Sequence, residues 1–82
     1  MKVKLEVNGW LVKFTGGKKA FEIDADNGAT VDTAIQTVGI PTSQVGFVSV
    51  KSIGNEAEKL VDMEHIVSEG DVLKLYSHIV GG

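Results

Sequence analysis

The chain ends in two glycines, and the carboxylate of the last one is the group in this sequence best suited to chemistry. Gly81 and Gly82 carry no Cβ, so their backbone can pass through a narrow channel in another protein without a steric penalty. An α-carboxylate has a reference pKa of about 3.5 and is ionised at neutral pH. It can attack the α-phosphate of ATP once a partner supplies the nucleotide and its metal. A terminal diglycine alone is also compatible with a chain end that tolerates any residue.

The residues before the diglycine are candidates for partner binding. Ile79 and Val80 are apolar but have little to bury them in a small monomer, so we expect them to dock into a groove of a partner. Tyr76 is a candidate interface anchor, because a tyrosine can lie half in water and half against an apolar partner. Packing of Tyr76 on its own sheet is an equal alternative. His78 is expected to be a solvated residue that contacts the partner's nucleotide site.

Other reactive sites find little support in the sequence. The absence of cysteine excludes a disulfide, a thiol nucleophile and a zinc knuckle. His65 and His78 lack the spacing of metal ligands, so we expect no bound metal. The Gly16-Gly17-Lys18 sequence is too short for a phosphate-binding loop and is better explained as a turn. An enzyme is therefore the least favoured interpretation, and no cofactor is expected to bind this chain.

Length and composition limit the class of protein further. The 82 residues suffice for one domain, and the 43% apolar content argues against disorder. The net charge of −3, without any arginine, is unfavourable for nucleic-acid binding. The longest apolar run, Val45 to Val50, is too short to span a membrane. The first residues alternate and lack the apolar block of a signal peptide, so we expect a cytoplasmic protein.

The first half of the chain predicts strands followed by a helix. Lys2 to Val7 and Phe21 to Ala25 alternate between apolar and charged residues, as half-buried strands do. Asn8-Gly9 predicts a tight turn, and the apolar stretch after it either forms a hairpin strand or prolongs a bulged one. Thr30 is a suitable N-cap for a helix from about Val31 to Val38. Helix-ending signals follow directly, namely Gly39 and Pro41.

The second half predicts two longer strands joined by an irregular crossing. Val45 to Val50 is rich in β-branched residues and predicts a central strand. The crossing is expected to contain a short strand near Lys59 to Val61 and a turn or two of helix around Met63 to Val67. A Gly70-Asp71 turn then leads into the last strand, Val72 to Tyr76. Its side chains expected to face the core are Leu73 and Leu75. These elements predict an α+β packing in which the helix covers one sheet face.

The stretch from Val67 to Tyr76, followed by Ile79-Val80-Gly81-Gly82, resembles the C-terminal signature of the ThiS/MoaD family of ubiquitin-like sulfur carrier proteins. In that family a Gly-Asp turn and an alternating last strand lead into a flexible tail that ends in Gly-Gly. The resemblance covers the whole chain in element order. It implies a β-grasp (ubiquitin-like) fold over residues 1–76, with a mixed sheet of about four to five strands and one main helix across one face. Residues 77–82 would form the flexible tail.

The resemblance also implies a function for the terminal carboxylate. An adenylating enzyme related to the ubiquitin-activating type, which supplies ATP and metal, would adenylate Gly82. A sulfur-transfer enzyme would then convert the adenylate to a thiocarboxylate, which donates sulfur in cofactor biosynthesis. The final partner would be a thiazole synthase, in the thiamine branch, or the large subunit of molybdopterin synthase, in the molybdenum or tungsten branch.

The sequence leaves the branch and two other functions open. The long segment before Thr30 resembles the molybdopterin branch, whereas the absence of proline before the diglycine is closer to the thiamine branch. The same carboxylate could instead modify target lysines, as ubiquitin does, or the chain could be a β-grasp interaction module without tail chemistry. Asp71 is expected to satisfy turn amides, with an ion pair to the activating enzyme as the alternative.

Overall fold

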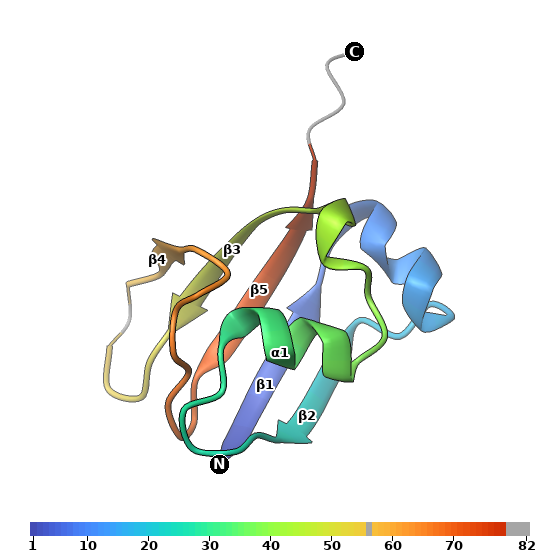
Figure 1. Ribbon diagram of the computed structural model, residues 1–82. Helices are drawn as coiled ribbons and strands as arrows, with labels where there is room; N and C mark the ends of the chain where they lie inside the picture. The colour runs from blue at the N-terminus through green and yellow to red at the C-terminus, as the bar shows by residue number, and fades with distance from the viewer. Residues whose placement is uncertain (56, 79–82) are drawn as a thin grey trace.

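A computed structural model describes residues 1–55 and 57–78. They form one five-stranded mixed sheet, in the order β2-β1-β5-β3-β4, with one α-helix across one of its faces (Figure 1). The central pair, β1 and β5, is parallel, and the other neighbours are antiparallel. The elements in chain order are β1 (Lys2–Val7), the 3-10 helix η1 (Gly9–Thr15), β2 (Ala20–Asp24), α1 (Val31–Thr37), the 3-10 helix η2 (Thr42–Gln44), β3 (Val45–Lys51), β4 (Lys59–Val61) and β5 (Val72–Ser77). The predicted α+β class is confirmed.

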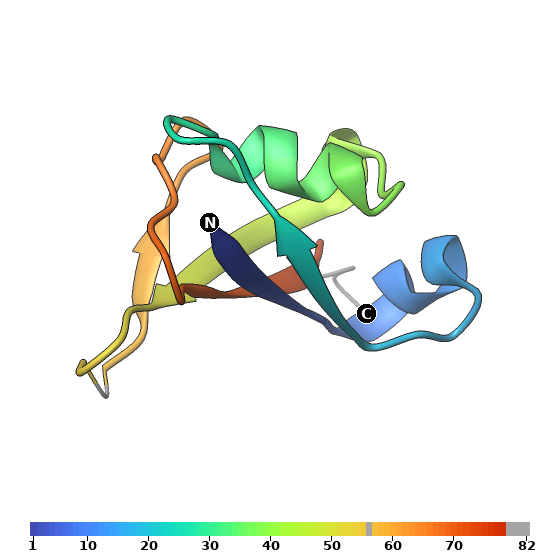
Figure 2. The ribbon, with the colours of Figure 1, turned by 90° about the horizontal axis from the view of Figure 1, so that it is seen from below.

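The core lies between the sheet and α1, as Figure 2 shows from below. In β1 and β5 every second side chain is buried, which matches the predicted alternation. The side chains without exposed surface are Val3, Leu5, Val31, Ile35, Leu73 and Leu75. Burial of each such side chain stabilises the fold by about 1.5–3 kcal/mol. No helix among the described residues is long and apolar enough to cross a membrane.

The predicted helix is confirmed together with its end signals. The Thr30 hydroxyl accepts a hydrogen bond from the Thr33 amide at 3.3 Å, as an N-cap does. The chain leaves α1 through Gly39, whose φ of 83° is the left-handed conformation that glycine adopts without penalty.

The residues after β1 differ from the prediction, because neither a hairpin strand nor a bulged strand forms there. Asn8 donates its backbone N–H to the Leu75 carbonyl at 3.0 Å, and Gly9 turns the chain into η1. The side chain of Leu11 is then buried at the end of the core. The apolar pattern of this stretch therefore reflects the covering of one end of the core, which local sequence does not distinguish from a strand.

The helical turn predicted around Met63 to Val67 is also wrong. The Met63 and His65 carbonyls accept hydrogen bonds from the Asp32 and Val31 amides, at 3.0 and 2.9 Å. The first amides of an α-helix lack partners within the helix, and these carbonyls supply them. The segment makes one hydrogen-bonded turn, in which the His65 amide donates to the Asp62 carbonyl at 3.3 Å, and it forms no helix because the Met63 and His65 carbonyls bond to α1.

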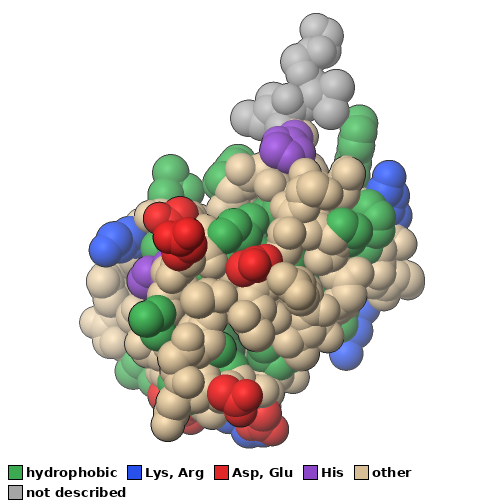
Figure 3. All heavy atoms as spheres, viewed as in Figure 1, with side chains coloured by type: hydrophobic (Ala, Val, Ile, Leu, Met, Phe, Trp, Pro, Cys, Tyr) green, Lys and Arg blue, Asp and Glu red, His purple; other side chains and the backbone are tan. Residues whose placement is uncertain are grey.

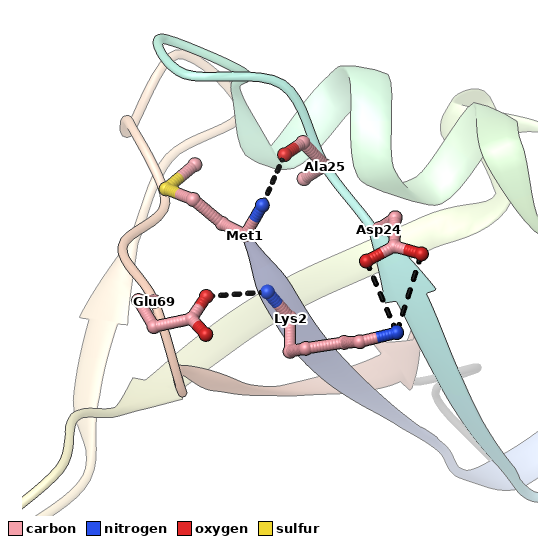
Figure 4. Close-up of polar contacts among 5 residues, drawn as sticks. All are labelled: Met1, Lys2, Asp24, Ala25 and Glu69. Atoms are coloured by element: carbon pink, nitrogen blue, oxygen red, sulfur yellow. Dashed lines mark hydrogen bonds and ion pairs between the residues drawn. The ribbon is translucent and has the colours of Figure 1, made fainter.

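The N-terminal residues tie β1 to its neighbours at the end opposite η1 (Figure 4). The Met1 ammonium group donates to the Ala25 carbonyl at 2.7 Å, and the Lys2 amide donates to the Glu69 carboxylate. The Lys2 ammonium lies 3.1 Å from Asp24, which raises the pKa of Lys2. These contacts hold the ends of β1 and β2 together.

Candidate functional site

The described chain ends at His78, just after β5 leaves the sheet. Figure 1 shows that this end of β5 lies at the same end of the molecule as η1 and η2, and Figure 3 shows hydrophobic side chains exposed around it. The predicted site residues Ile79, Val80, Gly81 and Gly82 lie outside the described residues. The structure therefore describes the place from which the diglycine segment starts, and the partner-binding and carboxylate predictions for these four residues remain predictions.

Gly46 makes close backbone packing possible at this place. The pairing of β3 with β5 shifts register between Val45 and Phe47, so Gly46 lies in a β-bulge. A Cβ on Gly46 would lie 2.8 Å from the Cα and N atoms of His78 and from the Ser77 carbonyl oxygen. Because all three are backbone atoms, no side-chain rotation could relieve the contact. The backbone after β5 runs directly against a position that only glycine fits.

Two further contacts surround the same backbone. A Cβ on Gly9 would lie 2.5 Å from the Ser77 hydroxyl oxygen, and Gly9 has a φ of 66°. On the other side, Nε2 of the exposed His78 ring lies 3.1 Å from the Ser43 carbonyl oxygen of η2. We call these five residues, Gly9, Ser43, Gly46, Ser77 and His78, the exit site. They come from four segments of the chain and fix the backbone at which the predicted tail begins.

The glycines of the exit site were missed as functional candidates in the sequence. Gly46 interrupts an otherwise β-branched strand pattern, and such a glycine often marks a bulge or a close backbone approach. For Gly9 the sequence predicts either a turn or a bulge in one long strand. His78 is exposed as predicted, but its contact with Ser43 pairs two residues 35 positions apart, which no local pattern predicts.

A small cavity of about 110 Å³ lies beside the exit site. Its walls come from η1, including Trp10 and Phe14, and from Gln44, Ser77 and His78. Trp10 is 63% exposed, although tryptophan is usually well buried. The helix η1, which replaces the predicted strand, therefore brings an exposed aromatic side chain close to the start of the predicted tail.

A second apolar area lies on the sheet face opposite α1, over β3, β4 and β5. The Tyr76 ring stacks on the Phe47 ring, with centroids 4.5 Å apart and planes 14° apart. Phe47 is 40% exposed, and Leu60 is 70% exposed on the same face. We call Phe47, Leu60, Val72 and Tyr76 the apolar sheet surface. Tyr76 thus packs on its own sheet and still contributes to an exposed apolar area, which combines the two alternatives left open by the sequence.

An ion pair interrupts the apolar sheet surface. The Lys74 ammonium contacts the Glu58 carboxylate, which also accepts a hydrogen bond from the Ser49 hydroxyl at 3.4 Å. The bond to Lys74 lowers the pKa of Glu58, and the same bond raises the pKa of Lys74. The contribution of Glu58 to stability is therefore lost as pH falls through its folded-state pKa. The contribution of Lys74 to stability is lost only as pH rises through the raised pKa of Lys74. Both stabilising contributions are therefore present at neutral pH.

Asp71 has a structural role. Its side chain is only 2% exposed, and Oδ2 accepts a hydrogen bond from the Ser68 amide at 2.8 Å. The predicted satisfaction of turn amides is confirmed. The alternative ion pair with an activating enzyme is incompatible with this burial. Among residues 1–55 and 57–78, no group of acidic and histidine side chains has an arrangement that could hold a metal ion.

The comparisons with known proteins establish the fold. No protein-family model and no curated protein matches the sequence. Two solved Haloferax volcanii structures, of SAMP1 and of small archaeal modifier protein 1, are 18% and 16% identical, with TM-scores of 0.70 and 0.67. The first alignment covers all of both chains, and the second covers 95% of this chain and 98% of the other.

A third similar structure is a complex of subunits 1 and 2 of molybdopterin-converting factor from Helicobacter pylori 26695. The matching chain is 19% identical, with a TM-score of 0.56 over all of both chains. The β-grasp, ubiquitin-like fold expected from the sequence is confirmed.

Proposed function

We propose that this chain is a ubiquitin-like sulfur carrier whose working group is the Gly82 carboxylate. The observation that carries the proposal is the position of the sequence Ile79-Val80-Gly81-Gly82 directly after the exit site of a β-grasp domain. The exit site fixes where this segment starts, and Trp10 and the apolar sheet surface offer a partner two places to bind nearby. A fixed starting point restricts the positions that a terminal carboxylate can reach, which favours reaction within a partner's active site.

The proposed chemistry needs two partner enzymes. An adenylating enzyme binds ATP and metal, and a carboxylate oxygen of Gly82 attacks the α-phosphate with release of pyrophosphate. A sulfur-transfer enzyme then supplies a sulfur nucleophile that displaces AMP, which leaves a thiocarboxylate. This chain supplies the carboxylate and the surface that the partners bind, and the proposal assigns it no catalytic side chain and no cofactor.

The final sulfur acceptor belongs to cofactor biosynthesis. The similar structure from Helicobacter pylori is a complex of two molybdopterin-converting factor subunits, which supports a molybdopterin-type synthase with this chain as small subunit. A thiazole synthase of the thiamine branch is the other candidate acceptor. Purification of the chain with its bound large partner from native cells would distinguish the two.

Protein modification is a second candidate function. One of the similar structures is that of a small archaeal modifier protein, and the same activated carboxylate could form an isopeptide bond with a lysine of a target. Lysine-linked conjugates that end in the Gly81-Gly82 remnant, detected in a native cell extract, would support this function.

The intact mass of the untagged protein from its native cells tests the carrier proposal. We expect a fraction heavier by the difference between one sulfur and one oxygen atom, with the change located at Gly82 by fragmentation. Incubation with the adenylating and sulfur-transfer enzymes and ATP should increase that fraction. An unchanged mass after incubation with active partner enzymes would contradict the proposal.

Substitution of Leu60 by aspartate is expected to weaken binding of the adenylating enzyme by about tenfold or more, because a charge would replace an exposed apolar contact. The matched control is Ile66→Asp, since Ile66 is 59% exposed but lies on the segment beside α1. Calorimetric titration measures both affinities. An equal loss of affinity for the adenylating enzyme in the two variants would exclude a specific role for the apolar sheet surface.

A further inference from the structure

A groove runs beside β2, at the opposite margin of the sheet from β4. Its volume is about 260 Å³, and it is lined by Ile23 and Ala25 on one side and by Ala34 and Thr37 of α1 on the other. The lining residues of α1 are small, so space is left between the helix and the edge strand. Figure 1 shows β2 at the margin of the sheet with α1 crossing the face beside it. The groove belongs to neither the exit site nor the apolar sheet surface.

The free edge of β2 presents backbone groups without partners in the sheet. Met1 and Ala25 exchange two hydrogen bonds, each of 2.7 Å, so they form a bonded pair of the antiparallel ladder. Bonded pairs recur at every second residue. The backbone groups of the residues between them therefore point away from β1. These residues are Ala20, Glu22 and Asp24, and a further strand could bond to all three.

We propose that β2 binds an extended, basic and apolar peptide segment of a partner protein by strand addition. Alternate side chains of an added strand point to opposite faces of the sheet. On the α1 side they would enter the groove, where valine or isoleucine fits beside Ile23, Ala25 and Ala34, and where Asp24 and Asp26 also line the space. On the other face they would lie beside Glu22 and Asp24, where lysine or arginine is favoured.

The charges around the groove specify the occupant. Asp24 pairs with Lys2, but Glu22 and Asp26 take part in no ion pair among the described residues. A basic segment would neutralise them. A second copy of β2 fits less well, because an antiparallel pair of two β2 strands would place Lys19 of one copy beside Ile23 or Ala25 of the other. One of the side chains that enter the groove would then be a lysine.

The test uses the full chain and a synthetic peptide of about eight residues, within the usual range of strand lengths, in which valine alternates with lysine and both ends are blocked. Backbone amide exchange followed by NMR is the readout. Addition of the peptide should slow exchange at Ala20, Glu22 and Asp24, whereas Phe21 and Ile23 should change little because β1 already protects them. N-methylated lysines cannot donate the ladder bonds of an antiparallel addition, and N-methylated valines cannot donate those of a parallel addition, so one of these two modified peptides should give no protection.

Two variants with matched controls locate the site. Thr37→Phe should fill the groove and abolish the protection, whereas Gln36→Phe, on another side of α1, should retain it. Glu22→Lys should weaken peptide binding by roughly tenfold through like charge, and Glu64→Lys, outside the groove, should not. Protection that is absent, that maps to Phe47 and Tyr76, or that arises from self-association without peptide would overturn the proposal. Deletion of Gly82 should leave peptide binding unchanged, so this test is independent of the carrier proposal.

Discussion

Deletion of Gly82 is expected to reduce adenylation of the chain by at least about a hundredfold while the domain remains folded. A chain shortened by one residue ends about 3.5 Å before its normal position. Misplacement of a reacting atom by about 1 Å can already cost a hundredfold in rate. Single-turnover formation of the acyl-adenylate, measured with the partner adenylating enzyme and labelled ATP, gives the rate directly. Thermal unfolding of the deletion variant should match that of the unchanged chain.

The companion variant Gly82→Ala keeps the length of the chain and adds only a methyl group. We expect it to be adenylated more slowly than the unchanged chain, because the added Cβ must enter a passage suited to glycine. Comparison of the two variants separates the reach of the carboxylate from the width of the passage. Adenylation of the deletion variant at the normal rate would refute a role for the Gly82 carboxylate.

Substitution of Gly46 by alanine is expected to slow adenylation by about tenfold or more and to lower stability by about 1–3 kcal/mol. The new methyl group would lie 2.8 Å from three backbone atoms of Ser77 and His78, so one of the two strands must move. Movement of β5 would redirect the segment that carries the carboxylate. Urea unfolding measures the stability, and single-turnover kinetics at saturating enzyme measure the effect on the reaction.

Two controls distinguish position from stability in this experiment. Val61→Ala removes a half-buried side chain of β4 that packs against the core, so it lowers stability without touching the exit site. Ser43→Ala keeps the backbone carbonyl group that His78 contacts, so it should change neither the stability nor the rate of adenylation. If folded Gly46→Ala protein is adenylated as fast as Val61→Ala protein, the exit site does not position the reacting end.

The sequence alone determined the elements whose signals are local. The alternation in β1 and β5, the N-cap Thr30 and the left-handed Gly39 just after α1 depend on periodicity and on single-residue conformational preferences, and the structure confirms them. These local signals predict only an α+β packing. The β-grasp fold was implied by the resemblance of the segment from Gly70-Asp71 to the terminal diglycine to a known family.

Only the tertiary structure decided the parts that depend on distant partners. The stretch after β1 forms η1 because Leu11 is buried at the end of the core, and residues 63–67 form no helix because the Met63 and His65 carbonyls bond to α1. The exit site brings Gly9 and Gly46 against Ser77 and His78 at the end of β5. The requirement for glycine at these two positions therefore arises only when β5 packs against them. Backbone packing between segments far apart in sequence leaves no periodic signal, and this is why the sequence predicts a reacting end but does not show which residues pack against the start of the predicted tail.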